Sequence, residues 1–547
     1  MGGTTLFITI SKIISEFTNT WPVSTGKMTR DLPRWLIGLL LFVTGCSVQQ
    51  VNTPAKAQAV TEPPVRAAAP TPPLPRPVIG APDPATLVAR ESPDEAFPFV
   101  RVADSNSPKK VIVHYFPPMP ISLDNSEPSA DYWTKQYLTA SGEGGKWADN
   151  GGYVRERPLP REPWPTMDWR DKDALLDVLR AKLMGADAFG VDIIGKQENQ
   201  YWDQAERICK AAAAVPNFYF IPEIDGASFS KYTVDDVVKA AEHFAQCPSV
   251  YRLSNGKILF IPFAPDIETA QFWHSVKDKM DADGVQIAFV PDLLNPGKAA
   301  AEFAPFSDCI SAWGDRDPNS IVGGSMEKAG ASAKALTRCW MQPIAPQDAR
   351  PKSFSFAEAS NTAMFRDSWM QAIKSSADYV QLITWNDYSE STEIAPSSGT
   401  QFLFYDLSAY YIQWYKTGRE PQIRADAIYY SHRPQIFNPA VDFPSGSKHF
   451  KIVGSTPLEN DVEMVAMLTK PAKMEIELNG QRTDADMPAG LRVLRVAASP
   501  GRPIFRILRE GRVVVQKVSD WTIDGKPARH VPDYFGGSST RTFIAPP

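Results

Sequence analysis

Eight short apolar runs, most of them separated by helical patterns, constrain the fold of this chain more than any other feature. The runs are Val111–Phe116, Ala188–Ile194, Phe218–Glu223, Ile258–Ile261, Gln286–Val290, Cys309–Trp313, Thr337–Met341 and Tyr379–Thr384. The amphipathic helical patterns between them include Lys172–Met184, Tyr201–Ala214, Thr233–Gln246 and Thr269–Met280. Thr233 and Thr269 are expected to begin their helices as N-caps. This alternation predicts an α/β fold, a (β/α)8 TIM barrel over residues 106–422. An open doubly wound sheet is the alternative, but no glycine-rich phosphate fingerprint follows any strand.

The pattern changes behind the last barrel helix. Short strands are predicted at Val462–Leu468, Lys473–Leu478, Leu491–Val496, Ile504–Leu508 and Arg512–Val518. Glu510-Gly511 is typical of a hairpin turn between the last two. We therefore predict a C-terminal β-sandwich over residues 423–547.

The N-terminal region has the pattern of an export signal. A basic segment, Met28–Arg34, precedes the apolar segment Trp35–Val43, which is too short to span a bilayer. Small residues before Cys46 resemble the lipobox of bacterial lipoproteins, in which the cysteine is acylated. We predict a lipoprotein signal region at 1–46, with the true start near Met28 and a lipid anchor on Cys46. Ser47 after the cysteine implies the outer membrane of the bacterial cell envelope. An ordinary secretory signal with a chance cysteine is the alternative.

Composition limits the other classes of function. Residues 47–105 are rich in Ala and Pro and are predicted to be a disordered tether. The net charge of −5 offers no basic excess for nucleic acid. The scattered histidines and the cysteine spacing predict no metal site and no cofactor. Cys209, Cys247, Cys309 and Cys339 could form disulfides after export, or stay as buried thiols. The oligomeric state is left open.

Acidic and aromatic side chains stand where the predicted strands end, which is where barrel enzymes place their active sites. They are His114, Asp192, Glu223, Asp292, Trp313, Trp385, Asn386, Asp387, Tyr388 and Glu390. Carboxylates for proton transfer, together with flat rings, predict a carbohydrate site. Structural alternatives are a hydrogen-bonded core role for His114, a buried pair for Asp192, and a turn for Asp387 and Glu390.

The spacing of Asp387 and Glu390 bears on mechanism. Positions three apart lie roughly 10 Å apart in an extended chain, and a partly folded loop would bring the carboxyl groups to about 6–9 Å. Inverting glycosidases need ~6.5–9.5 Å and retaining ones ~5–5.5 Å. The spacing weakly favours inversion.

The segment Val380–Ser391, with Ile394-Ala-Pro396 behind it, resembles the last barrel strand of glycoside hydrolase family 71, the α-1,3-glucanases or mutanases. Weaker similarities lie at His114–Phe116, Phe189–Asp192, Phe289–Asp292 and Asp308–Trp313. The resemblance covers roughly residues 110–420 and implies a β-sandwich behind the barrel. It also implies an inverting mechanism carried by Asp387 and Glu390. Glu390 would be the general acid and Asp387 the base, with the reverse also open. Trp385, Tyr388, Trp313 and Asp292 would contact the substrate.

Two features depart from that family. About fifty residues, Pro117–Asp171, separate the first strand from the first barrel helix, and loops of this length are usually functional. We expect this insertion to cover or reshape the cleft. Glu393 stands where the family pattern is usually uncharged.

The leading hypothesis is a lipid-anchored, inverting glycoside hydrolase that cleaves α-1,3 linkages inside an α-glucan. A barrel glycosidase of another specificity, such as an endo-mannosidase, is the second hypothesis. The third is a glycan-binding lipoprotein without turnover.

Overall fold

The computed structural model describes residues 83–92, 96–101, 107–197, 199–440 and 448–541. The predicted lipoprotein signal region of residues 1–46, including Cys46, lies outside the described residues. So does most of the predicted tether.

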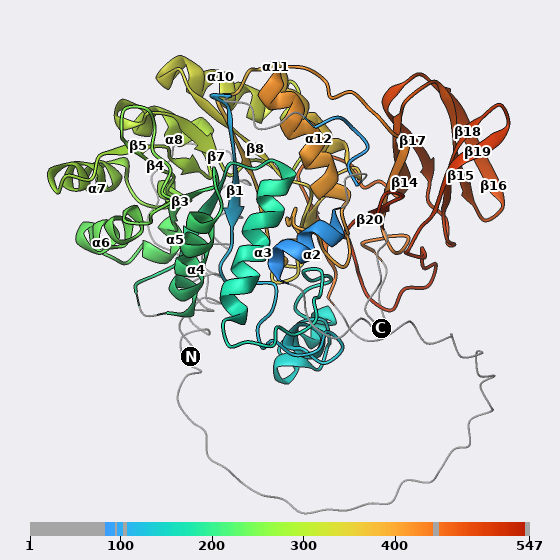
Figure 1. The fold of residues 1–547 in the computed structure, drawn as a ribbon, viewed down its shortest axis with the longest axis horizontal. Helices are drawn as coiled ribbons and strands as arrows, with labels where there is room; N and C mark the ends of the chain where they lie inside the picture. The colour runs from blue at the N-terminus through green and yellow to red at the C-terminus, as the bar shows by residue number, and fades with distance from the viewer. Residues whose placement is uncertain (1–82, 93–95, 102–106, 198, 441–447, 542–547) are drawn as a thin grey trace, which may run out of the picture. The chain divides into compact units, whose positions relative to one another are not determined.

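Short parallel strands form the centre of the fold (Figure 1). They are β1 (Lys110–Tyr115), β2 (Ala188–Ile193), β3 (Tyr219–Ile224), β4 (Ile258–Phe260), β5 (Ile287–Phe289), β6 (Asp292–Leu293), β7 (Ile310–Ala312), β8 (Trp340–Ile344) and β11 (Tyr379–Leu382). Almost every residue in them is buried, as expected of strands covered on both faces. The register places Val111 of β1 opposite Val380 of β11. All eight predicted runs contribute a strand, and the fifth continues into β6.

Within the described residues, the main sheet has seven strands in the order β3-β2-β1-β11-β8-β7-β6, and β4 pairs with β5. Backbone hydrogen bonds connect both ends of this sheet to the residues after β4. Phe263 N donates to Ile224 O at 2.9 Å, and Asp292 N donates to Pro262 O at 3.0 Å. The predicted parallel α/β fold is confirmed as a curled sheet, whose carboxyl ends carry the predicted site residues.

Helices alternate with these strands and cover the sheet (Figure 1). They are α3 (Trp169–Met184), α4 (Gln200–Ala214), α5 (Gly226–Phe229), α6 (Val234–Ala245), α7 (Ala270–Ala282), α8 (Pro296–Phe303), α9 (Pro318–Ile321), α10 (Ser325–Thr337), α11 (Ala363–Lys374) and α12 (Leu403–Thr417). Thr233 and Asp236 form a reciprocal capping box at the start of α6, and Thr269 caps α7. Both predicted helix starts are confirmed. None of the helices in the described part of the chain combines the length and apolar character needed to cross a bilayer.

The segment before β1 is folded onto the sheet and its helices. Helix α2 (Pro84–Glu91) lies against α3, where Glu91 pairs with Arg180 at 2.5 Å. Phe97 and Phe99 are buried in the main hydrophobic core. These apolar contacts offset the entropy that ordering the segment costs. The prediction of a disordered tether extending to residue 105 is wrong for residues 83–92 and 96–101.

The C-terminal part contains two four-stranded antiparallel sheets, in the orders β17-β14-β12-β20 and β16-β15-β18-β19. The strands are β12 (Ala427–His432), β14 (Asp461–Leu468), β15 (Ala472–Leu478), β16 (Gln481–Met487), β17 (Gly490–Ala497), β18 (Ile504–Arg509), β19 (Arg512–Val518) and β20 (Phe535–Ser538). One hydrophobic cluster takes side chains from both sheets, among them Met464, Ile476 and Phe505. The five predicted strands are confirmed, whereas β12, β16 and β20 were not predicted. Glu510 and Gly511 have positive φ, so the predicted hairpin turn is confirmed.

The remaining elements are short. They are β9 (Asp348–Arg350), β10 (Ser355–Ala357), β13 (Lys451–Val453), η2 (Trp133–Tyr137), η3 (Gly142–Gly145), η4 (Ala148–Asn150), η5 (Pro265–Ile267) and η6 (Ala304–Phe306). Strands β13, β10 and β9 form a small sheet that joins the two parts of the chain.

The insertion of residues 117–171 is folded through buried polar contacts. Arg157 pairs with Asp131 at 2.6 Å inside the insertion. Arg161 pairs with Asp173 of α3 at 2.6 Å, and Trp164 Nε1 donates to the same carboxylate at 2.8 Å. Buried pairs of this kind are strongly destabilising to break. These contacts anchor the insertion to α3.

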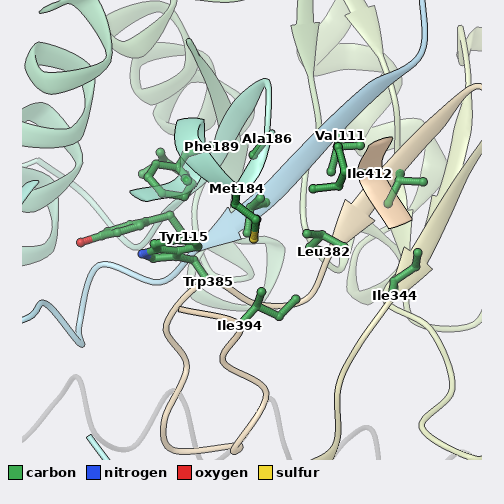
Figure 2. Close-up of a cluster of buried hydrophobic side chains, with 14 of the residues drawn as sticks. Val111, Tyr115, Met184, Ala186, Phe189, Ile344, Leu382, Trp385, Ile394 and Ile412 are labelled. Carbon is green, nitrogen blue, oxygen red and sulfur yellow. The ribbon is translucent and has the colours of Figure 1, made fainter. Parts of the chain in front are cut away.

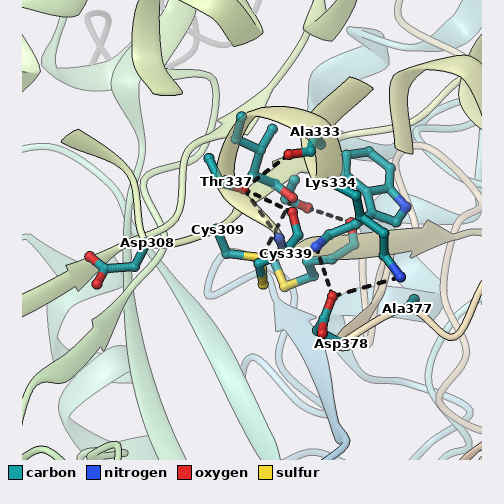
Figure 3. The surroundings of a disulfide bond; sticks show 12 residues. Asp308, Cys309, Ala333, Lys334, Thr337, Cys339, Ala377 and Asp378 are labelled. Atoms are coloured by element: carbon teal, nitrogen blue, oxygen red, sulfur yellow. Dashed lines mark hydrogen bonds and ion pairs between the residues drawn. A yellow bond between two sulfur atoms is a disulfide. The ribbon is translucent and has the colours of Figure 1, made fainter. Parts of the chain in front are cut away.

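Two disulfides involve the four cysteines of the described region. Cys209 of α4 is bonded to Cys247 behind α6, and Cys309 is bonded to Cys339. Figure 3 shows that the second bond joins the chain just before β7 and β8. It therefore lies at the amino ends of the strands, away from the edge that carries the predicted site.

Candidate active site

The carboxyl edge of the sheet gathers most of the predicted polar residues. His114 is the second-last residue of β1, Asp192 lies in β2 and Glu223 in β3. Asp292 begins β6, and Asp387 and Glu390 follow β11. Because parallel strands end at the same edge, residues far apart in sequence meet here.

His114 is the centre of a buried hydrogen-bonded group. Its Nδ1 lies 2.5 Å from Glu223 Oε2, and Gln381 Nε2 donates to the other oxygen of Glu223 at 3.2 Å. Its Nε2 is 4.0 Å from the carboxylate of Asp192. The imidazole ring also meets the edge of Trp313, with ring centroids 4.8 Å apart. If Nδ1–H donates to Glu223, Nε2 is left facing Asp192.

Several carboxyl groups around His114 hold protons more tightly than usual. Burial, followed by the charges of Asp225, Glu223 and Asp387, raises the pKa of Asp192 well above its usual range. Burial raises the pKa of Asp225 to about 6. Burial and the charge of Glu223 raise the pKa of Asp292 well above normal. Clustered acids with raised pKa values are common at catalytic sites.

Asp387 lies in the tight turn that follows β11. Its Oδ1 accepts hydrogen bonds from Ser389 N at 2.9 Å and from Ser389 Oγ at 2.6 Å. Its own N–H donates to Thr384 Oγ1 at 2.8 Å. These bonds fix the direction of the carboxylate, which retains 6% exposure.

Glu390, on the same turn, is paired with a residue that was not predicted. Arg350 Nη2 lies 3.3 Å from Glu390 Oε2. The same guanidinium donates to both oxygens of Asp348 at 2.7 and 2.6 Å, and Arg316 lies 3.7 Å from Asp348. Two arginines near the ends of β7 and β8 could have indicated this network, but an arginine after a strand is usually a surface residue.

Lys352, which was also not predicted, lies close enough to both carboxylates for their charges to act on it. Burial lowers its pKa, and the charges of Asp387, Glu390 and Glu143 partly oppose that shift. Its Nζ lies 5.1 Å from the ring centroid of Tyr153, which belongs to the insertion. The insertion therefore meets the predicted catalytic pair through a lysine.

Trp385 is a core residue. It is fully buried, its Nε1 donates to Asp177 of α3 at 2.9 Å, and its ring packs against Phe189. Figure 2 shows Trp385 in the apolar cluster with Tyr115 and Phe189. The ring of Trp385, predicted as a substrate contact, thus fills the core in this structure and presents no surface to the edge of the sheet.

Asn386 and Tyr388 hold the insertion in place. Asn386 Oδ1 accepts from Phe116 N at 2.8 Å, and its Nδ2 donates to the carbonyls of Phe116 and Met119 at 3.0 and 2.8 Å. Tyr388 is 1% exposed and packs edge-on against Trp133. Both side chains, predicted as substrate contacts, are buried here against the insertion.

The other predicted binding residues differ in how much of their surface is exposed. Glu223 and Asp292 have no exposed surface in this structure, so they face neighbouring side chains and not the open edge of the site. His114 and Asp192 retain 2% and 3% exposure, and Trp313 is half-buried. These three, with Asp387 and Glu390, remain available to a ligand. No group of His, Cys, Asp and Glu side chains among the described residues is arranged to hold a metal ion.

Two carboxylates with different partners on one turn can divide the two proton transfers of glycoside hydrolysis. One carboxyl group gives a proton to the leaving oxygen and the other accepts a proton from water. Asp387 with its two donors from Ser389, and Glu390 beside Arg350, provide such a pair.

Comparisons with known proteins bear on this chemistry. A mutanase from Penicillium rubens is 24% identical over 373 residues, covering 64% of this chain and 79% of its own length. The glucan endo-1,3-alpha-glucosidase agn1 of Schizosaccharomyces pombe is 22% identical over 398 residues, covering 66% of this chain and 88% of its own. Among solved structures, an endo-alpha-mannosidase of GH99 from Bacteroides thetaiotaomicron has 14% identity and a TM-score of 0.43, with 56% of this chain and 98% of that chain covered.

The model of the family described as glycosyl hydrolase family 71 matches residues 165–531. The match includes Asp387 and Glu390, and it starts after His114 and after nearly all of the insertion. More than half of the chain is matched. The chain belongs to glycosyl hydrolase family 71 and is a glycosyl hydrolase.

Proposed function

We propose that this protein hydrolyses α-1,3-glucosidic linkages inside an α-glucan. Family membership and the names of the related mutanase and endo-1,3-alpha-glucosidase support this substrate. The observation that carries the proposal is the position of Asp387 and Glu390. They share one turn at the carboxyl edge of the sheet, where Ser389 binds Asp387 and Arg350 lies beside Glu390.

The reaction proceeds with inversion. Glu390 protonates the glycosidic oxygen as the bond from that oxygen to the anomeric carbon breaks. Asp387 takes a proton from a water molecule whose oxygen bonds to the anomeric carbon from the opposite face. The two hydrogen bonds from Ser389 suit an ionised Asp387, which a general base must be. Arg350 forms a bidentate contact with Asp348, whereas a single 3.3 Å contact joins it to Glu390. The guanidinium is therefore bound mainly to Asp348.

Substrate binding involves the exposed parts of the same edge. The half-buried ring of Trp313 offers an apolar surface to a sugar, and His114 and Asp192 offer polar groups for hydroxyls. Glu223 and Asp292 act on substrate through these neighbours.

The architecture that supports this site is a (β/α)8 barrel over residues 106–422 and a β-sandwich over residues 423–547. The hydrogen bonds from Phe263 to Ile224 and from Asp292 to Pro262 support closure of the barrel. The shared hydrophobic cluster of the two C-terminal sheets supports the sandwich.

The protein acts outside the cytoplasm, anchored by lipid on Cys46 in the envelope of a bacterium, at the outer membrane. Residues 1–46 are the signal and the residues from 47 to about 82 are the tether. The two disulfides support export, because such bonds persist in oxidising compartments. Cys46→Ser should move the protein from the membrane fraction to the soluble periplasmic fraction. Unchanged membrane association would refute the lipid anchor.

A substrate panel tests the activity. The full chain is incubated separately with α-1,3-glucan, α-1,4-glucan and α-mannan, and new reducing ends are measured. Release from α-1,3-glucan as oligosaccharides supports the proposal. Release from α-mannan alone favours the endo-mannosidase hypothesis, and binding of glucan without release favours a glycan-binding protein.

A further inference from the structure

Two buried glutamates lie in contact outside the site described above. One belongs to the insertion, and the other belongs to the turn of residues 387–393, called the catalytic turn below. Glu156 belongs to the insertion and is 1% exposed. Glu393 lies three residues after Glu390 and is fully buried. The two side chains lie within hydrogen-bonding contact of each other. Both features that depart from the family pattern, the insertion and the charged residue at 393, therefore meet at one point.

Glu156 holds the segment between the catalytic turn and α12. Its Oε2 accepts hydrogen bonds from Ser397 Oγ, and from the N–H groups of Gly399 and Thr400 at 3.1 Å each. A Cβ on Gly399 would lie 2.4 Å from this oxygen, so the close approach requires glycine. An oxygen with three donors is best satisfied when Glu156 is ionised.

The other three carboxyl oxygens of the two glutamates lack a hydrogen-bond donor among the remaining described residues. Glu156 Oε1 and both carboxyl oxygens of Glu393 have no donor from any other described residue. Two ionised carboxylates cannot hydrogen-bond to each other, and an unpaired buried charge is costly. A proton shared by the pair resolves this, as it does for carboxyl groups in contact elsewhere.

Within the part of the chain that the structure describes, no cation is paired with either glutamate. Asp533, from the C-terminal part, faces both glutamates and disfavours their ionisation. Tyr388 faces both from the catalytic turn. The arginines Arg155 and Arg433 act on Asp533, which also accepts a hydrogen bond from Ser391 at 2.5 Å.

Burial raises the pKa of Glu156 to about 7. Burial and the neighbouring Glu156 raise the pKa of Glu393 well above its usual range. Glu393 is thus the partner that keeps the proton. Folded-state pKa values above the unfolded value stabilise the folded protein at low pH, and this stabilisation is lost as pH rises through about 7 and beyond.

We propose that Glu393 and Glu156 are positioning residues that share one proton and so fix the catalytic turn of residues 387–393 against the insertion. Loss of that proton at alkaline pH leaves two repelling carboxylates beside Glu390 and loosens the turn. The effect on turnover rests on the proposed function, whereas the effect on stability does not.

Two variants of the full chain separate the roles of the pair. In Glu393→Gln the amide is neutral at every pH and can donate to Glu156, so it replaces the protonated acid. In Glu156→Gln the three donors lose their carboxylate. Glu302→Gln, on an exposed position of α8, is the matched control. Thermal unfolding and glucan hydrolysis are measured from pH 5.5 to 9.

We expect Glu393→Gln to match the wild type at pH 5.5 and to lose less stability and turnover than the wild type at pH 9. The difference in the folding equilibrium constant should be about tenfold for each unit of pKa shift that the substitution removes. Glu156→Gln should be less stable than the wild type at pH 8, where Glu156, with a pKa raised to about 7, is ionised. Other buried acids, such as Asp192 and Asp292, titrate equally in all four proteins, so the comparison isolates the pair.

Identical pH dependence of unfolding in Glu393→Gln and the wild type would overturn the proposal. Failure of Glu393→Gln to fold at pH 5.5 would also overturn it, because a neutral side chain should fit there. If the wild type shows no glucan hydrolysis, the activity proposal fails, while the unfolding comparison still decides on the shared proton.

Discussion

Trp385 Nε1 donates a 2.9 Å hydrogen bond to the buried carboxyl of Asp177 in α3. Trp385, two residues before Asp387, is thereby fixed to α3. Burial raises the pKa of Asp177 to about 7, and the bond from Trp385 opposes that rise. This bond anchors the chain between β11 and the turn that carries Asp387 and Glu390.

Trp385→Phe should destabilise the protein by about 2–4 kcal/mol, since it removes ring volume and a hydrogen bond to an ionisable group. The bond is stronger to the ionised carboxylate, so the loss should be larger at pH 8 than at pH 6. Urea unfolding at both values measures it. A loss of glucan binding with unchanged stability would contradict the structural role.

This pair also illustrates how much of the fold and site the sequence predicts. Apolar periodicity predicts the parallel strands and the helix starts at Thr233 and Thr269 because burial and capping are local signals. It does not distinguish Trp385 in a core from a tryptophan in a sugar subsite, since both follow a strand. That difference depends on Asp177, which is 208 residues away in sequence.

The same limit applies to the polar network of the site. The turn after β11 is recognisable from its two acids and its amide. Arg350 and Lys352 are not, because their partners come from another strand end and from the insertion. The strands β12, β16 and β20 have weak apolar alternation and depend on pairing with distant partners.

Arg350→Met should reduce both stability and turnover. It leaves Glu390 without its guanidinium and removes the bidentate contact of Asp348, and breaking a buried pair costs about 3–5 kcal/mol. Arg350→Lys keeps the charge but not the bidentate geometry. Urea unfolding and hydrolysis of α-1,3-glucan measure the series. Equal activity of Met and wild type would exclude a role for this arginine.

Lys352→Met should reduce kcat/KM by about tenfold, equivalent to ~1.4 kcal/mol of transition-state stabilisation. The charges of Asp387 and Glu390 act on the side chain, so its removal changes the charge balance of the pair. Tyr153→Phe is the matched control, since it keeps the ring beside the lysine. A tenfold loss in the control as well would assign the effect to the insertion and not to the charge.

Replacing both Cys309 and Cys339 by Ala should lower stability by about 2–4 kcal/mol, because the bond closes a loop with a sequence separation of 30 residues. The bond lies before β7 and β8 (Figure 3), at the edge opposite the site. Thermal unfolding should therefore change while kcat at low temperature does not. An equal loss of kcat would show that this edge of the sheet affects the site.

The most direct test of the account is hydrolysis of α-1,3-glucan by Asp387→Asn and Glu390→Gln, with Glu302→Gln, on an exposed position of α8, as a control that keeps both carboxyl groups. Each of the two carboxyl variants should lose at least about 10³-fold in reducing-end release, in proportion to the loss of one general acid or base, and should remain folded. The first product of the wild type, followed by NMR, should have inverted anomeric configuration. Activity within about tenfold of the wild type in either variant would contradict the assignment of these two residues as the catalytic pair.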